Sequence, residues 1–205
     1  THPSWNLLLK LQTKHELATF WALLSTSAAV LPIGILLYLR YPIEYPGWWF
    51  ILGTSILHTG YFFCISKSYS KIELTLAYPI SRGTGPILVP ILGVVVLHEF
   101  VSYLAVWGIT VVLLGIFTVY WTGSTRSLAQ GPFTFLKDSG IRYALGTGLS
   151  IAAYSIWDKV AMQYVAPFLY MYLMCVGSSL GLIPILLKTF FIDCLSKCHK
   201  CLGAS

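Results

Sequence analysis

Residues 74–97 read LTLAYPISRGTGPILVPILGVVVL. A helix needs about 20 mostly apolar residues to cross a bilayer, so this stretch predicts a membrane-spanning helix that ends before His98 and Glu99. Its one charged residue is Arg82. A charge at membrane depth costs about 2.5–3.5 kcal/mol on insertion scales, so it normally faces a partner or a wet cavity. Arg82 is therefore a candidate ligand contact; the alternative is an arginine whose side chain reaches back to the membrane surface.

Prolines and glycines flank this arginine. Pro79 and Pro86 each remove a backbone donor and clash with the preceding turn. Gly83 and Gly85 lie between the two prolines. Carbonyl groups freed in this way are tolerated at membrane depth only against protein or water. We therefore expect a broken helix around Arg82, with its opening facing protein or water.

The composition is that of an integral membrane protein. Hydrophobic residues make up 57% of the 205-residue chain and charged residues 10%, whereas soluble domains average about 25% charged residues. The net charge of +6 does not require nucleic acid as a partner, because the basic residues gather in particular connections. We expect a lipid bilayer and a small-molecule substrate as partners and no nucleic acid, and a homodimer is left open.

Six full spans are predicted, and a short apolar segment precedes them. That segment, residues 1–11, has the pattern of the stump of a first transmembrane helix. Because the chain begins with Thr1 on this stump, we expect it to be a fragment of a longer protein. The predicted fold class is an all-α, polytopic transmembrane helical bundle. The expected spans are residues 17–39, 48–65, 74–97, 101–120, 142–165 and 168–187.

Basic residues are distributed unequally between the two ends of these spans. Of the 13 lysines and arginines, Arg40 and Lys159 lie on one side, Arg82 lies within the membrane, and the rest lie on the other side. By the positive-inside rule, the richer side and the C-terminal tail are cytoplasmic. We expect a multi-pass protein of the cell membrane, the inner membrane in a bacterium. The residues of the richer side are Lys10, Lys14, Lys67, Lys71, Arg126, Lys137, Arg142, Lys188, Lys197 and Lys200.

The sequence also carries a weak internal repeat at a shift of 152 residues. The matched pairs are Trp5 with Trp157, Asn6 with Asp158, and Pro32 with Pro184. Five predicted spans separate the two copies, and an odd number of spans inverts the second copy in the membrane. Inverted repeats are typical of secondary transporters, which bind their substrate near the midplane between the repeats. The alternative is coincidence in a chain rich in leucine and tryptophan.

Four stretches have the landmarks of a known family. They are HPSWNLLLK (residues 2–10), the run from residue 57 to 86 that contains AYPISRGTGP, LHEFVSYLAVWGITVVLLGI (97–116) and AAYSIWDK (152–159). Together they resemble the EamA-like family of the drug/metabolite transporter superfamily. The resemblance implies ten helices in two inverted five-helix repeats around a central cavity. The chain departs from the family where His98 replaces the usual glycine and where the second repeat stops after two helices.

On this basis we expect four segments. They are a first repeat with a truncated helix 1 (1–121), a cytoplasmic connection (122–141), the start of a second, inverted repeat (142–187) and a basic cysteine-rich tail (188–205).

The candidate substrate-binding residues are polar or aromatic side chains within or beside the spans. A guanidinium binds a carboxylate or phosphate through two parallel hydrogen bonds, so Arg82 favours an organic anion or an amino-acid-like substrate. An intramembrane histidine relays protons or simply bonds a neighbouring helix. Aromatic side chains line a cavity or pack between helices, and the residues matched by the repeat gate the cavity or anchor the helices. The candidates are Arg82, His58, Tyr61, Tyr78, Tyr154, Trp157, Asp158, Trp5 and Asn6.

The predicted function is secondary transport of a small metabolite by alternating access. The alternative is a seven-helix receptor or photoreceptor, although no span offers a buried lysine with a carboxylate counter-ion. No nucleophile–base pair, phosphate loop or paired carboxylates occur in the spans, so we expect no enzyme and no cofactor. The tail could hold zinc or be palmitoylated, but its spacing fits no usual zinc pattern, so we expect no metal site there. The tail residues in question are Cys194, Cys198, His199 and Cys201.

Overall fold

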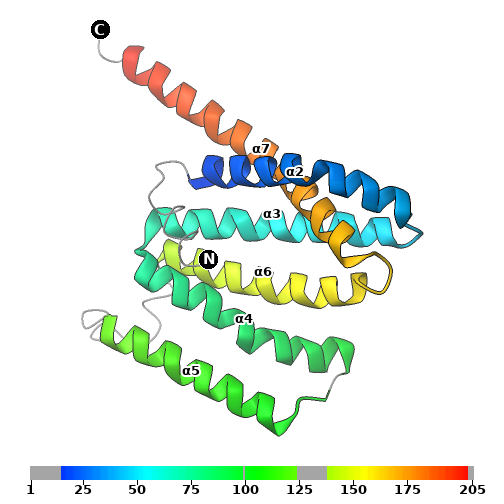
Figure 1. Ribbon diagram of the computed structural model, residues 1–205. Coiled ribbons are helices and arrows are strands. Elements are labelled where there is room, and N and C mark those ends of the chain that lie inside the picture. The colour runs from blue at the N-terminus through cyan, green and yellow to red at the C-terminus, as the bar shows by residue number, and fades with distance from the viewer. Residues whose placement is uncertain (1–14, 99, 124–137, 203–205) are drawn as a thin grey trace.

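The computed structural model describes residues 15–98, 100–123 and 138–202, and it places six helices and no strand in these ranges (Figure 1). This confirms the predicted all-α, polytopic helical bundle. Helix α4 has the bounds that the sequence predicted. The helices are α2 (His15–Arg40), α3 (Gly47–Lys71), α4 (Leu74–Leu97), α5 (Tyr103–Gly123), α6 (Ser139–Ala161) and α7 (Pro167–Leu202).

Four of these helices are long and apolar enough to cross a membrane: α2, α3, α4 and the Pro167–Lys188 part of α7. Helix α5 contributes a shorter apolar stretch, Tyr103–Gly115. Helix α6 is less apolar because it carries Arg142, Asp158 and Lys159 together with several small polar residues. It packs against α3 and α4, so protein rather than lipid covers much of its surface.

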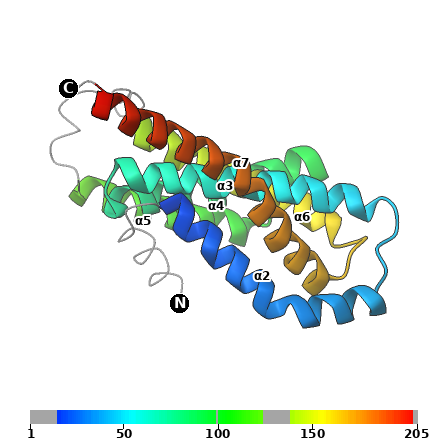
Figure 2. The same cartoon turned by 90° about the horizontal axis from the view of Figure 1, so that it is seen from above.

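Successive helices run in opposite directions, so their ends gather at two faces of the bundle (Figure 1). Helix α6 lies between α3 and α4, while α7 crosses α2 and packs against both α2 and α3 (Figures 1 and 2). Helix α5 packs chiefly against α4, at the edge of the bundle. The alternation fits the topology deduced from the basic residues, because Arg40 and Lys159 end helices at one face and Lys71 ends a helix at the other.

The expected break in α4 is wrong. The helix is continuous through Pro79, Pro86 and Pro90, although its ribbon follows a bent path in Figure 1. Prolines are tolerated in membrane helices when neighbouring helices and small local adjustments compensate for the lost hydrogen bonds. Helix α4 also packs closely on α6 here, since a Cβ added at Gly85 would lie 2.9 Å from the Ile151 side chain.

Two helices are longer than the sequence indicated. Helix α3 continues past residue 65 to Lys71, because its polar last turns find partners on α6; Ser68 Oγ donates to the Gly140 carbonyl at 3.1 Å. Helix α7 continues from the predicted span into the tail as far as Leu202. Its 36 residues correspond to about 54 Å, well beyond the roughly 30 Å of a bilayer's hydrocarbon core. Figure 1 shows its C-terminal part extending beyond the other helices.

Candidate functional site

A polar stripe on α3 forms the centre of the candidate site. Thr54, His58 and Tyr61 are four and three residues apart, so they share one face of the helix. All three are buried, with 0%, 8% and 9% of their surfaces exposed. Buried polar side chains in a membrane helix need partners, and α4, α6 and α7 supply them.

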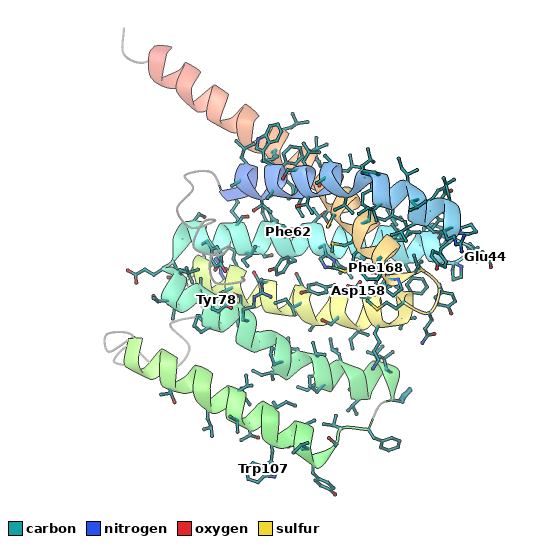
Figure 3. The ribbon with its side chains drawn as sticks, viewed as in Figure 1. Glu44, Phe62, Tyr78, Trp107, Asp158 and Phe168 are labelled. Atoms are coloured by element: carbon teal, nitrogen blue, oxygen red, sulfur yellow. The ribbon has the colours of Figure 1, made fainter. Side chains whose placement is uncertain are left out.

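At one end of the stripe, the Asp158 carboxylate on α6 is held by hydroxyl groups from two other helices. Thr54 Oγ1 donates to Asp158 Oδ1 at 2.8 Å, and the Tyr170 hydroxyl on α7 donates to the same oxygen at 2.6 Å. Figure 3 shows Asp158 between α3 and α6, near the start of α7 where Phe168 lies. One carboxylate oxygen therefore joins α3, α6 and α7.

The same hydrogen bonds determine where His58 carries its proton. Thr54 Oγ1 has a single proton and gives it to Asp158, so toward His58 Nδ1, 3.0 Å away, it can only accept. The Thr54 carbonyl, also 3.0 Å from Nδ1, is likewise an acceptor. A neutral His58 therefore carries its proton on Nδ1, which leaves Nε2 as a hydrogen-bond acceptor.

Arg82 lies at the other end of the stripe. Its Nη2 donates to the Tyr61 hydroxyl at 3.1 Å, and its guanidinium carbon lies 5.9 Å from the centre of the Tyr61 ring. Arg82 is half-buried, and no carboxylate among the described residues pairs with it. Two of the candidate residues, Arg82 and Tyr61, are thus in direct contact in the structure.

Tyr154 on α6 connects the two ends. Its ring stacks on the His58 imidazole with centroids 4.2 Å apart and meets the Tyr61 ring edge-on at 5.9 Å. Arg82, Tyr61, Tyr154, His58 and Asp158 thus form a continuous series of contacts, with Thr54 joining the last two. We call these six residues the α3 seam. Tyr154 therefore packs against both of the α3 rings in the seam, His58 and Tyr61.

The other candidates have different surroundings. Trp157 donates its indole N–H to the Phe50 carbonyl at 2.9 Å and packs against Gly53, so it anchors α6 on α3. Tyr78 is half-buried near the start of α4 (Figure 3) and makes no hydrogen bond or ring contact with the seam in the described part of the chain. Trp5 and Asn6 lie outside the described residues. The inverted repeat that pairs Trp5 with Trp157 therefore stays a prediction.

Sequence reasoning missed Thr54 and Tyr170. Thr54 had a signal, because it precedes His58 by one helical turn and a hydroxyl there can reach the imidazole. Tyr170 had none, because only the fold brings the start of α7 to the end of α6.

Comparison with known proteins shows the family. Residues 6–121, more than half of the chain, match the model of the EamA-like transporter family. The chain belongs to the EamA-like transporter family. No curated protein and no solved structure matches it. As a member of this family it is a multi-pass membrane protein from a family of transporters of small solutes rather than enzymes.

The EamA match covers four of the six seam residues, Thr54 among them. His58, Tyr61 and Arg82 lie inside the matched residues, whereas Tyr154 and Asp158 follow them in α6. The seam therefore joins the family-defining segment to the next part of the chain. Family membership also favours a transporter over the seven-helix receptor that the sequence left open.

Proposed function

We propose that this EamA-like protein is a secondary transporter that moves a small organic anion or amino-acid-like solute by alternating access, with Arg82 as the contact for the anionic group. The observation that carries the proposal is the state of the Arg82 guanidinium. Of its five N–H donors, one bonds the neutral Tyr61 hydroxyl, and no carboxylate of the described residues balances its charge.

An unbalanced guanidinium inside a bilayer is costly unless water or a ligand reaches it. Arg82 is the ninth residue of α4, which is about 13 Å along the helix from its start. At that depth, a solute carboxylate would supply both the missing charge and two parallel acceptors for the planar fork. The seam residues beside Arg82 are candidates for the rest of the binding surface.

The orientation in the membrane belongs to the same proposal. We place the protein in the cell membrane with the α3/α4 connection and the C-terminal tail in the cytoplasm, because ten of the basic residues counted above lie on that side. In a chain without its native cysteines, an external thiol reagent should label Glu44→Cys, between α2 and α3, and miss Ser70→Cys near the end of α3. The reverse pattern would invert the assignment. The homodimer stays a prediction.

Transport by the purified full chain in proteoliposomes tests the function. We expect uptake or counterflow of a labelled carboxylate solute by the unmodified chain and loss of flux in Arg82→Ala. Arg82→Lys should keep partial flux, because lysine keeps the charge but cannot form the two parallel hydrogen bonds of a guanidinium. Arg40→Ala, at the exposed end of α2, is the matched control and should leave flux unchanged. Normal flux in a folded Arg82→Ala protein would make Arg82 an anchor at the membrane surface.

A further inference from the structure

Asp158 is a second unbalanced charge in the seam. Its Oδ1 accepts two hydrogen bonds, from Thr54 and Tyr170. Its other oxygen, Oδ2, accepts none from the described residues, and no lysine or arginine among them pairs with the carboxylate. Lys159 is adjacent in the sequence, so the two side chains do not face each other on the helix. Hydroxyl groups thus fix Asp158 in place and leave one oxygen for another donor.

The two unbalanced charges are separated by a defined length of α3. Asp158 binds Thr54 and Arg82 binds Tyr61, and these two α3 residues are seven positions apart on the same face. Seven residues correspond to two helical turns, about 10 Å along the axis. Between the two ends lie the stacked rings of His58 and Tyr154, whose faces carry no charge that would pair with a solute.

We propose that the seam binds a solute whose carboxylate and ammonium are held apart by an apolar chain, an ω-amino acid, with the carboxylate on Arg82 and the ammonium on Asp158 Oδ2. The inference rests on the proposed function and names its substrate class. An α-amino acid carries both charges on one carbon, so it cannot reach two groups that lie two turns apart. A simple carboxylate leaves the charge of Asp158 unbalanced.

The acceptors at the Asp158 end suit an ammonium. An ammonium group has three N–H donors and no acceptor. The carboxylate oxygen Oδ2 supplies the charge, and the Nε2 atom of His58, left as an acceptor by the proton on Nδ1, is a second polar atom in the same cluster. Thr54 fixes both side chains, so this end of the seam is organised before a ligand arrives.

Binding to the full chain in lipid nanodiscs tests the proposal, measured by calorimetry with three probes. These are ε-aminocaproate, its α-amino isomer norleucine, and caproate, which lacks the amine. A hydrogen-bonded charge pair contributes about 1.5–3 kcal/mol, so ε-aminocaproate should bind about tenfold or more tightly than either other probe. The isomer controls for composition and size, and caproate controls for the contribution of the carboxylate alone.

Asp158→Asn is the decisive variant, because the amide oxygen still accepts from Thr54 and Tyr170 while the charge is lost. It should reduce the affinity for ε-aminocaproate to that of caproate and leave caproate binding unchanged. Glu44→Gln, a carboxylate in the exposed connection between α2 and α3, is the matched control and should change neither.

The outcomes separate this inference from the proposed function. If caproate binds and depends on Arg82 but ε-aminocaproate gains nothing, the ω-amino acid is wrong and the anion transporter stands. Equal binding of norleucine and ε-aminocaproate would contradict the proposed separation between the solute's carboxylate and its ammonium. Equal weakening of all three probes by Asp158→Asn would make Asp158 a packing residue. If none of the three probes binds, neither proposal survives for carboxylates of this size.

Discussion

Helices α7 and α5 each carry a pair of glycines on one face, but only the pair on α7 is packed against another helix. On α7, a Cβ added at Gly177 or Gly181 would clash with the Ser55 or Thr59 side chain of α3. On α5, a Cβ added at Gly108 or Gly115 would meet nothing within 4 Å. The first pair brings two helices together, and the second lies on an open face.

The difference shows what holds this bundle together. Lipid is as apolar as leucine, so membrane helices associate through close packing and hydrogen bonds rather than through the hydrophobic effect. Ser55 donates to the Ile51 carbonyl of its own helix at 2.7 Å, so a compact surface faces the α7 glycines. Helix α5 instead exposes large apolar side chains, including Leu104 and Trp107, as a lipid-facing helix would.

The largest effect is expected from filling the α7 contact. Gly181→Leu would force a branched side chain into Thr59 and separate α7 from α3. Overpacking costs about 1–3 kcal/mol and occasionally more, so we expect a clear fall in the melting temperature of the detergent-solubilised chain. Gly108→Leu on α5 should leave that temperature almost unchanged. Similar losses in both variants would mean that α5 is packed against something in the folded protein.

A middle effect is expected from Thr54→Val, which keeps the side-chain shape but removes the donor to Asp158. Leaving buried polar groups short of a partner costs about 1–3 kcal/mol. Thr110→Val on α5 removes a hydroxyl that bonds only its own helix, at the Val106 carbonyl, and should cost little. Thermal unfolding of the two variants compares them directly, and equal stability would show that the Thr54–Asp158 bond does not support the bundle.

The smallest effect is expected from Trp157→Phe. The ring stays against Gly53, but the hydrogen bond to the Phe50 carbonyl is lost, at a cost of about 0.5–1.5 kcal/mol. The control is Trp107→Phe on α5, whose indole is 69% exposed, and it should be neutral. Urea or thermal unfolding would measure both. A larger loss for Trp107 than for Trp157 would contradict the assignment of α5 to the lipid-facing side.

Much of the fold could be predicted from the sequence, because a bilayer forces apolar spans of fixed length. The bounds of α4 are the clearest case. The length of α3 could not be predicted, because its polar last turns are buried against residues of α6 that lie far along the chain, such as Gly140. The break expected in α4 was wrong: each proline removes a backbone hydrogen bond, but this local cost does not interrupt the helix, which continues to Leu97 and packs on α6.

The candidate site, like the fold, could be predicted from the sequence only in part. Residue type and position within the spans were enough to select Arg82, His58, Tyr61 and Tyr154 as candidates, while their mutual contacts come from the structure. The partners of Asp158 did not follow from either, since Tyr170 reaches it only through the crossing of α7. The GxxxG pair on α7 was recognisable by its spacing, whereas nothing in the spacing of the α5 glycines shows that they face outward.

The reactivity of a cysteine at position 82 tests the central proposal most directly. In a chain without its native cysteines, Arg82→Cys should react with a small water-soluble thiol reagent, and a bound carboxylate solute should slow the reaction. A cationic reagent should restore part of the lost flux and an anionic one should not, because the site requires a positive charge. Thr110→Cys on α5 should stay unreactive. If Arg82→Cys is as unreactive as Thr110→Cys, or if both reagents leave flux equally low, Arg82 does not face a solute.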